Sequence, residues 1–132
     1  MSREIVQRYL RGVDAWNRGA LDEWLDDAVT PGWELVTGGA FPGLAPVYRG
    51  RDGAIEMWSA IRGPWENQGL HIEIERIEDL GASVLALATM RARGSQSGVD
   101  VAIRWAHVIS GDQQIRSYAN WDDALHAVGL AE

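Results

Sequence analysis

The chain has 132 residues, of which 46% are hydrophobic and 23% charged, and this balance predicts one soluble globular domain over residues 1–132. It has no cysteine, and all 12 of its basic residues are arginine, which excludes disulfides, thiolate nucleophiles, Schiff bases and a P-loop lysine. The net charge of −7 argues against binding to nucleic acid or to an anionic membrane surface.

The first segment of the chain has the spacing of a helix. Apolar side chains recur at three- and four-residue steps over residues 5–16, and Tyr9 lies on this stripe. Ser2 is suited to begin the helix and Gly19 to end it. A second, shorter helix is expected over residues 21–28, with acidic side chains in its first turn.

A strand, a loop and a third helix come next. The strand is expected over residues 33–37, and the loop over residues 38–50 is rich in glycine and proline. Because this loop also carries large apolar side chains, we expect it to fold back over the protein. Asp52 is expected to cap the third helix, which ends at Gly63-Pro64 and faces inward with Ile55, Trp58 and Ile61.

The second half of the chain changes to the two-residue alternation of strands. Four strands are expected, over residues 71–77, 84–93, 99–109 and 114–121. A last helical turn follows, and Gly129 with Leu130 is expected to end it as a Schellman motif. The order α-α-β-α-β-β-β-β-α predicts an α+β fold in which helices cover one face of a mostly antiparallel sheet.

The last hairpin predicts which side chains share a face. If Gly111-Asp112 is a two-residue turn, His107 faces Arg116 and Trp105 faces Tyr118. A face of aromatic rings and polar groups suits the lining of a pocket for a hydrophobic small molecule, although the same rings would also suit a plain core. The predicted lining comprises Tyr9, Trp16, Trp58, Trp105, His107, Arg116, Tyr118 and Asn120.

The opposite face of these strands is expected to be a smooth field of alanines. It takes in Ala86, Ala88, Ala102, Ala106 and Ala119, if Arg93 pairs with Val99 across the loop over residues 94–98. An exposed apolar field of this size is unusual on a monomer. We therefore expect a homodimer through this face.

Several segments together resemble the SnoaL-like and ketosteroid isomerase branch of the nuclear transport factor 2-like superfamily. These are residues 6–9, 16–22, 42–44, 47–53, 98–101, 104–108, 124–125 and 129–130, so the resemblance covers nearly the whole chain. It implies a cone-shaped curved sheet wrapped around three helices and a deep apolar pocket, commonly in a homodimer. The fold hosts enzymes and binding proteins alike, so it does not by itself fix an activity.

The resemblance carries over few catalytic residues. Tyr9 is placed where ketosteroid isomerases keep the tyrosine of their oxyanion hole, but their two aspartates correspond to Leu35 and Trp105. No strand has the Arg-x-Asp step of limonene epoxide hydrolases. Asp122 or Asn120 lies near the late aspartate of polyketide cyclases, and His107 with Asn120 is similar to a pair in scytalone dehydratase.

Two candidate bases remain by elimination. His107 would be held neutral by Arg116 and could act as a general base, or it could be a bonded core histidine. Asp122 could be a buried acid/base group or the cap of the last helix. Tyr9 could donate to a substrate oxygen or simply pack, and Arg116 could bind a substrate anion or pair with a carboxylate.

These residues favour a cofactor-free acid/base enzyme of the isomerase, cyclase, dehydratase or hydrolase type, acting on a hydrophobic carbonyl or epoxide compound. The alternative is a non-catalytic ligand-binding protein of the same fold. The scattered histidines, with no cysteine, predict no metal site, and no glycine-rich loop predicts a nucleotide. No targeting or membrane-spanning segment is recognisable, so the expected compartment is the cytoplasm.

Overall fold

The computed structural model describes residues 2–38, 41, 43–63, 70–93, 100–111 and 113–130. Within these residues the elements in chain order are α1 (Ser2–Asn17), α2 (Leu21–Ala28), β1 (Glu34–Val36), β2 (Val47–Arg49), α3 (Gly50–Arg62), β3 (His71–Asp79), β4 (Ser83–Arg93), β5 (Asp100–Ser110), β6 (Gln114–Tyr118) and α4 (Trp121–Ala127). The predicted α+β fold class is confirmed. The structure has one strand, β2, that the predicted order of elements lacks.

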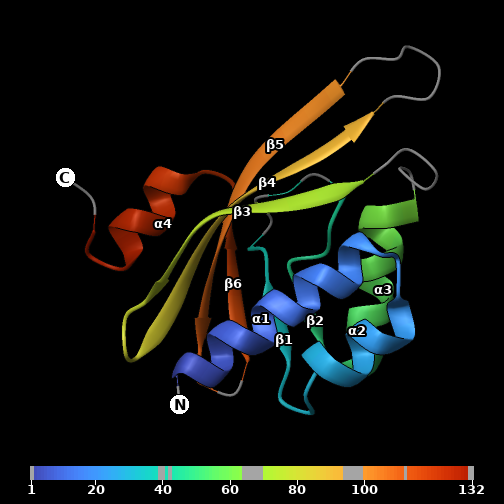
Figure 1. Ribbon diagram of the computed structural model, residues 1–132, viewed down its shortest axis with the longest axis horizontal. Coiled ribbons are helices and arrows are strands. Elements are labelled where there is room, and N and C mark those ends of the chain that lie inside the picture. Colours follow the sequence, from blue (N-terminus) through green and yellow to red (C-terminus); the bar gives the residue numbers. More distant parts are fainter. Residues whose placement is uncertain are drawn as a thin grey trace.

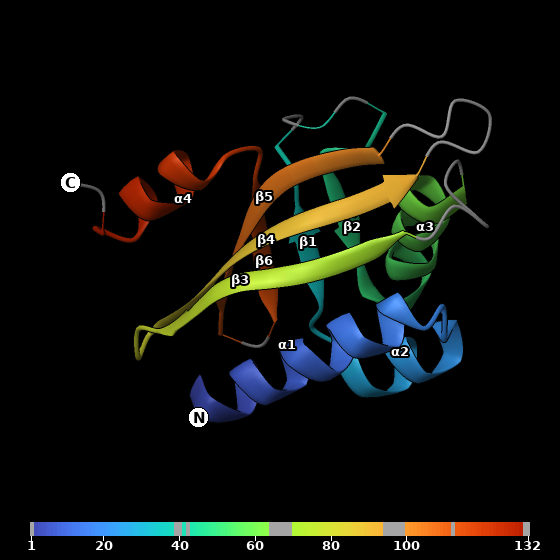
Figure 2. The ribbon, with the colours of Figure 1, turned by 45° about the horizontal axis from the view of Figure 1, so that its top comes forward.

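The strands form one mixed sheet in the order β2-β1-β6-β5-β4-β3. Paired strands run antiparallel except β1 and β6, which are parallel. The sheet curves around α1, α2 and α3, while α4 lies against its other side (Figures 1 and 2). We call the side that faces α1 the concave side and the side that faces α4 the convex side.

The first two helices follow the predicted pattern. Helix α1 ends where Gly19 takes a φ of +69° and its N–H donates to the Trp16 carbonyl oxygen at 3.0 Å. Helix α2 buries the side chains expected to face inward, Trp24, Leu25 and Ala28. Packing of these two helices against the sheet therefore follows from their apolar stripes.

Strand β2 lies inside the segment predicted as a loop. The loop does fold back, since Phe41 and Leu44 pack on the core, and Tyr48 pairs with Leu35 of β1. Tyr48 also presses on α3 at Gly53, where an added Cβ would lie 3.1 Å from the Tyr48 backbone.

Helix α3 begins earlier than predicted and buries a different face. The helix begins at Gly50 rather than at Asp52, and it buries Ala54, Met57 and Trp58. The predicted inward position of Ile55 is wrong, because Ile55 is 37% exposed. Arg62 is the last residue of α3, and Pro64 of the predicted stop lies outside the described residues.

The predicted register of the last hairpin is wrong by one residue. His107 pairs with Ser117 rather than with Arg116, because Ser110 pairs with Gln114 and leaves three residues in the turn. Of the predicted turn, Asp112 lies outside the described residues. The third turn residue, Gln113, has a φ of +69°, a conformation in which few side chains are found.

The side chain of Gln113 explains why it occupies that position. Its Oε1 accepts from the backbone N–H of Thr30 at 2.8 Å and from the Thr30 hydroxyl at 2.7 Å. Gln113 is 6% exposed, and its carbonyl oxygen accepts from the N–H of Glu34. These bonds tie the turn to the α2–β1 connection and offset the cost of its backbone conformation.

The one-residue shift divides the predicted alanine field. Ala86 and Ala88 pair with His107 and Trp105 and therefore lie on the concave side. Ala106 lies on the convex side, where α4 covers it completely. Arg93 pairs with Asp100 rather than with Val99, which lies outside the described residues together with the loop over residues 94–98.

Helix α4 is capped by a different residue than predicted. The Asn120 Oδ1 accepts from the N–H of Asp123 at 2.9 Å, so Asn120 is the N-cap and Asp122 lies exposed in the first turn. The expected Schellman end is confirmed, because the N–H of Leu130 donates to the Leu125 carbonyl oxygen at 2.8 Å.

Candidate functional site

Tyr9 of α1 and His107 of β5 meet on the concave side of the sheet. The Tyr9 hydroxyl oxygen lies 2.8 Å from His107 Nδ1, and the ring centroids are 5.8 Å apart in an edge-to-face arrangement. Both side chains are half-buried. Within the part of the chain that the structure describes, Tyr9 is the one hydrogen-bond partner of the His107 ring. The structure thus brings together two predicted site residues that lie 98 positions apart.

Burial sets the charge of both groups. It lowers the pKa of His107 from 6.5 to about 3, and it raises the pKa of the Tyr9 hydroxyl above its ordinary value. Both side chains are therefore neutral at physiological pH. The predicted cause, a facing Arg116, is wrong, because Arg116 pairs with Val108 and lies on the opposite side of the sheet from His107.

The hydrogen bond also decides which imidazole nitrogen carries the proton. A phenol O–H is a stronger donor than a neutral imidazole N–H, and an imidazole nitrogen is a stronger acceptor than a phenol oxygen. We therefore assign the Tyr9 hydroxyl as the donor to His107 Nδ1. The neutral ring then keeps its proton on Nε2, where it is a donor for the oxygen of a ligand.

Trp105 stands beside His107 on the same side of β5. The two ring centroids are 4.3 Å apart and the rings are tilted by 48°. Trp105 is 7% exposed, and its indole Nε1 has no hydrogen-bond partner in the described part of the chain. Buried donors in folded proteins are nearly always bonded, so this group is an exception. The sequence predicts Trp105 only as part of the pocket lining, because no sequence pattern marks an unpartnered indole.

Trp16 and Trp58, also predicted to line the pocket, belong to an aromatic cluster between α1, α2 and α3. Their ring centroids are 4.8 Å apart, and Trp24 lies 6.0 Å from Trp16. The Arg62 guanidinium lies over both rings, 5.4 Å from Trp16 and 5.0 Å from Trp58, and donates to the Trp16 carbonyl oxygen. Contact of these rings with a ligand stays a prediction.

Four predicted site residues lie away from the Tyr9–His107 pair. Arg116 and Tyr118 are on the convex side of β6, and Tyr118 packs in the cluster that α4 covers. Asn120 and Asp122 are exposed at the start of α4. Their predicted common face with His107 is wrong, because a one-residue shift in register moves every side chain of a strand to the other face.

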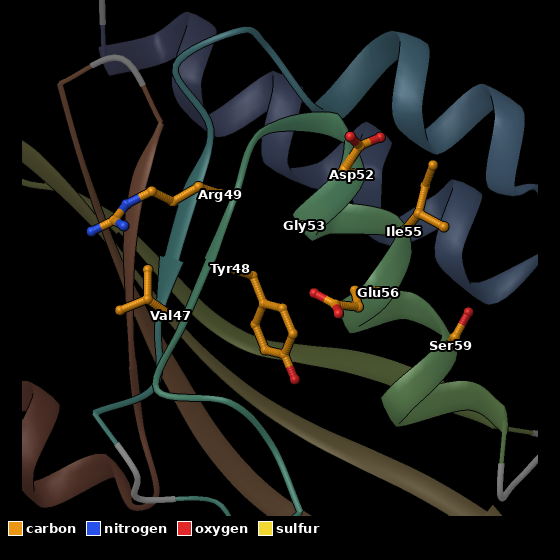
Figure 3. Close-up of a pocket in the computed structure, with 8 residues that line it drawn as sticks. All are labelled: Val47, Tyr48, Arg49, Asp52, Gly53, Ile55, Glu56 and Ser59. Carbon is orange, nitrogen blue, oxygen red and sulfur yellow. The ribbon is translucent and has the colours of Figure 1, made fainter.

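A separate hollow of about 560 Å³ lies between β2 and α3. Figure 3 shows its lining, with the Glu56 carboxylate directed toward Tyr48 and Arg49 directed away from α3. Arg49 donates to the Glu34 carboxylate at 2.7 Å, and the Tyr48 hydroxyl accepts from the N–H of Ala45. None of the predicted site residues lines this hollow.

The described residues contain no group of three or more histidine, aspartate or glutamate side chains that could hold a metal ion. His71 is at the start of β3 and His126 is in α4, and both are exposed. No helix in the described part of the chain is long and apolar enough to cross a membrane.

A family model supports the resemblance found in the sequence. The SnoaL-like domain model matches residues 6–115. No curated protein matches the chain.

Solved structures share the fold at low sequence identity. TerC, co-crystallised with polyporic acid, is 16% identical with a TM-score of 0.71, over 95% of this chain and 97% of its own. A protein described as a SnoaL-like polyketide cyclase from Jannaschia sp. CCS1 is 18% identical with a TM-score of 0.66, over 98% and 94%. A protein of ketosteroid isomerase-like fold from Catenulispora acidiphila, in complex with trimethylamine, is 13% identical with a TM-score of 0.65, over 93% and 92%.

Proposed function

Because the chain belongs to the SnoaL-like domain family, we propose that it is a cofactor-independent acid/base enzyme acting on a hydrophobic carbonyl or epoxide compound. The reaction is an isomerisation, a cyclisation, a dehydration or an epoxide hydrolysis. The observation that carries the proposal is the neutral Tyr9–His107 pair, joined at 2.8 Å on the concave side of the sheet.

The proposed role of His107 is to donate a hydrogen bond to the reacting oxygen. With a pKa of about 3, the ring is a weak base at neutral pH, so it supports donation from Nε2 better than proton removal. As negative charge develops on the substrate oxygen, a fixed N–H donor stabilises it and contributes about 10²–10³-fold in rate. Tyr9 holds the imidazole in the orientation and tautomer that this donation needs.

The proton released by the substrate passes to solvent in this scheme. Within the described residues, no carboxylate hydrogen-bonds to Tyr9 or to His107. For a ketone, the step breaks a C–H bond next to the carbonyl and leaves an enolate oxygen on the His107 N–H. Hydrogen-bonding to that oxygen acidifies the C–H without a cofactor.

The structural neighbours support a small-molecule ligand. TerC was crystallised with polyporic acid, and the Catenulispora protein with trimethylamine. The Jannaschia protein is described as a polyketide cyclase. We propose that this chain likewise binds a small molecule, and we place that molecule on the concave side because Tyr9 and His107 meet there.

Deuterium exchange into a simple ketone tests the proposal. Butyrophenone in D₂O is incubated with the protein, and loss of its α-proton signal is followed by NMR. We expect the wild-type protein to accelerate the exchange and His107→Phe to lower the acceleration about 10²–10³-fold. His126→Phe, at the exposed histidine of α4, is the matched control and leaves the rate unchanged.

The alternative function is a ligand-binding protein without catalysis. The low pKa of His107 favours it, since a ring that stays neutral can hold a ligand oxygen without moving a proton. If butyrophenone binds and exchange is no faster than in buffer, the catalytic proposal fails and the binding function stands.

The homodimer is proposed without an assigned surface. The alanine field that motivated it is divided between two sides of the sheet, and Ala106, under α4, is 0% exposed. Sedimentation at micromolar concentration checks the assembly, and a strict monomer contradicts it. A cytoplasmic location likewise stays a prediction from the sequence.

A further inference from the structure

Two buried indole N–H groups, those of Trp16 and Trp105, have no hydrogen-bond partner among the residues that the structure describes. The first is enclosed by other indoles, with Trp58 and Trp24 tilted against the Trp16 ring at 64° and 73°. Trp16 thus lies among the rings of the cluster between α1, α2 and α3, whereas Trp105 lies beside the predicted site residue His107.

The ring next to Trp105 cannot supply the missing acceptor. Its neighbour is His107, at 4.3 Å between centroids, and the Nδ1 lone pair of His107 is already engaged by Tyr9. The remaining nitrogen of His107 carries a proton and is itself a donor. Two donors therefore stand side by side on the concave side, and neither can satisfy the other.

The spacing of these donors points to two acceptors. Trp105 and His107 are two residues apart on β5, so their side chains leave the strand in parallel, about 6.8 Å apart at the backbone. Donors that serve a single oxygen converge from different directions. Donors on two side chains that leave one strand on the same side match two oxygens on neighbouring parts of one ligand.

We infer that Trp105 is a specificity-determining residue, whose indole N–H binds a second oxygen of the ligand beside the oxygen held by His107. The inference rests on the proposed function, because it takes the ligand to be a hydrophobic carbonyl compound. It narrows the ligand class to an apolar body with a head of two neighbouring oxygens, such as a β-diketone or its enol. Leaving a buried donor unpaired costs affinity, so ligands with a single oxygen bind less tightly.

Three probes of nearly equal size test the inference. Benzoylacetone has two oxygens, butyrophenone has one, and butylbenzene has none. Dissociation constants for the three are measured by ligand-observed NMR with the full chain. For the wild-type protein we expect each added oxygen to tighten binding about two- to tenfold.

Variants assign the second oxygen to Trp105. Trp105→Phe keeps an aromatic ring and removes the N–H, so it abolishes the preference for benzoylacetone over butyrophenone and retains the preference for butyrophenone over butylbenzene. Trp33→Phe is the matched control, since it removes the indole N–H of a buried tryptophan that is not part of the predicted lining, and it leaves both preferences intact.

The wild-type spectrum gives a reading that does not depend on whether the variants fold. The indole proton of Trp105 moves downfield with benzoylacetone and stays unmoved with butylbenzene. An equal response to all three probes would mean that an ordered water meets the N–H, and the inference would be overturned.

The dissociation constants distinguish a failure of the inference about Trp105 from a failure of the proposed function. If benzoylacetone and butyrophenone bind equally well, or if Trp105→Phe keeps their difference, the inference falls and the proposed function stands. If butyrophenone binds no better than butylbenzene, His107 holds no oxygen, and the proposed function falls together with the inference.

Discussion

His107 is neutral in the folded protein, and this lowers the free energy of unfolding at low pH. Its pKa is 6.5 when exposed and about 3 in the fold. Between these values the unfolded chain binds a proton that the folded chain does not, so the free energy of unfolding falls as the pH drops through this window. Above about pH 6.5 neither state is protonated, and the contribution of His107 to stability is fully present.

Replacing His107 by glutamine is expected to flatten this pH dependence. Glutamine keeps a polar group of similar size near Tyr9 and does not titrate. Urea midpoints at about pH 7 and about pH 4 measure the effect, which we expect to be a smaller loss of stability on acidification than in the wild-type protein. His126→Gln, at an exposed position of α4, should leave the wild-type pH dependence in place.

Tyr9 is expected to control the tautomer of His107. With the hydroxyl bonded to Nδ1, the wild-type ring carries its proton on Nε2. Tyr9→Phe keeps the aromatic contact and removes the hydroxyl, so both tautomers should become populated. Long-range ¹H–¹⁵N spectra of the histidine ring measure this directly. A wild-type ring protonated on Nδ1 would contradict the assignment.

The sequence predicted the two residues of this pair and not their contact. Tyr9 was found from its place on a helical stripe and His107 from its place on a strand. Their hydrogen bond depends on how α1 crosses the sheet. Neither the helical pattern around Tyr9 nor the strand pattern around His107 specifies that crossing. The unpartnered indole of Trp105 is further from prediction, because a missing partner depends on every neighbouring side chain.

For the helices and strands, the position in the sequence was easier to predict than the face that each one buries. Strands β4 and β5 lie within one residue of their predicted bounds, whereas β6 ends at Tyr118 rather than at residue 121, and the register between β5 and β6 is shifted by one residue. The cause is Gln113, a residue that rarely adopts positive φ and is kept there by Thr30. That contact spans 83 positions and has no local signal in the sequence.

The turn residue should therefore be costly to replace. Gln113→Ala removes the acceptor for the Thr30 N–H and hydroxyl and keeps the unfavourable φ of +69°. We expect a loss of about 1–3 kcal/mol in the free energy of unfolding, measured by urea denaturation. Gln114→Ala, at the exposed neighbouring glutamine, is the control and should cost less than about 0.5 kcal/mol. Equal costs would show that the Thr30 bonds do not hold the turn.

The overall fold was predictable because the chain is divided between two periodicities. Helical stripes fill the first half and strand alternation fills the second, and short connections leave few ways to cover one sheet with these helices. The missed strand β2 has three residues and lies at an edge, where pairing leaves little pattern in the sequence. The solved structures compared above share this architecture at 13–18% identity. Similarity at this level indicates the fold, whereas an activity must be argued from the side chains of the site.

If the Tyr9–His107 pair polarises the oxygen of a bound carbonyl compound, the carbonyl stretch of bound butyrophenone shifts. Infrared difference spectra with ¹³C-labelled ketone isolate this band from those of the protein. We expect the band at lower frequency in the wild-type protein than in an apolar solvent, because an N–H donor weakens the C=O bond. In His107→Phe it should return to the apolar-solvent position. A wild-type band already at the apolar-solvent position would contradict the proposed hydrogen bond from His107 to the ketone oxygen.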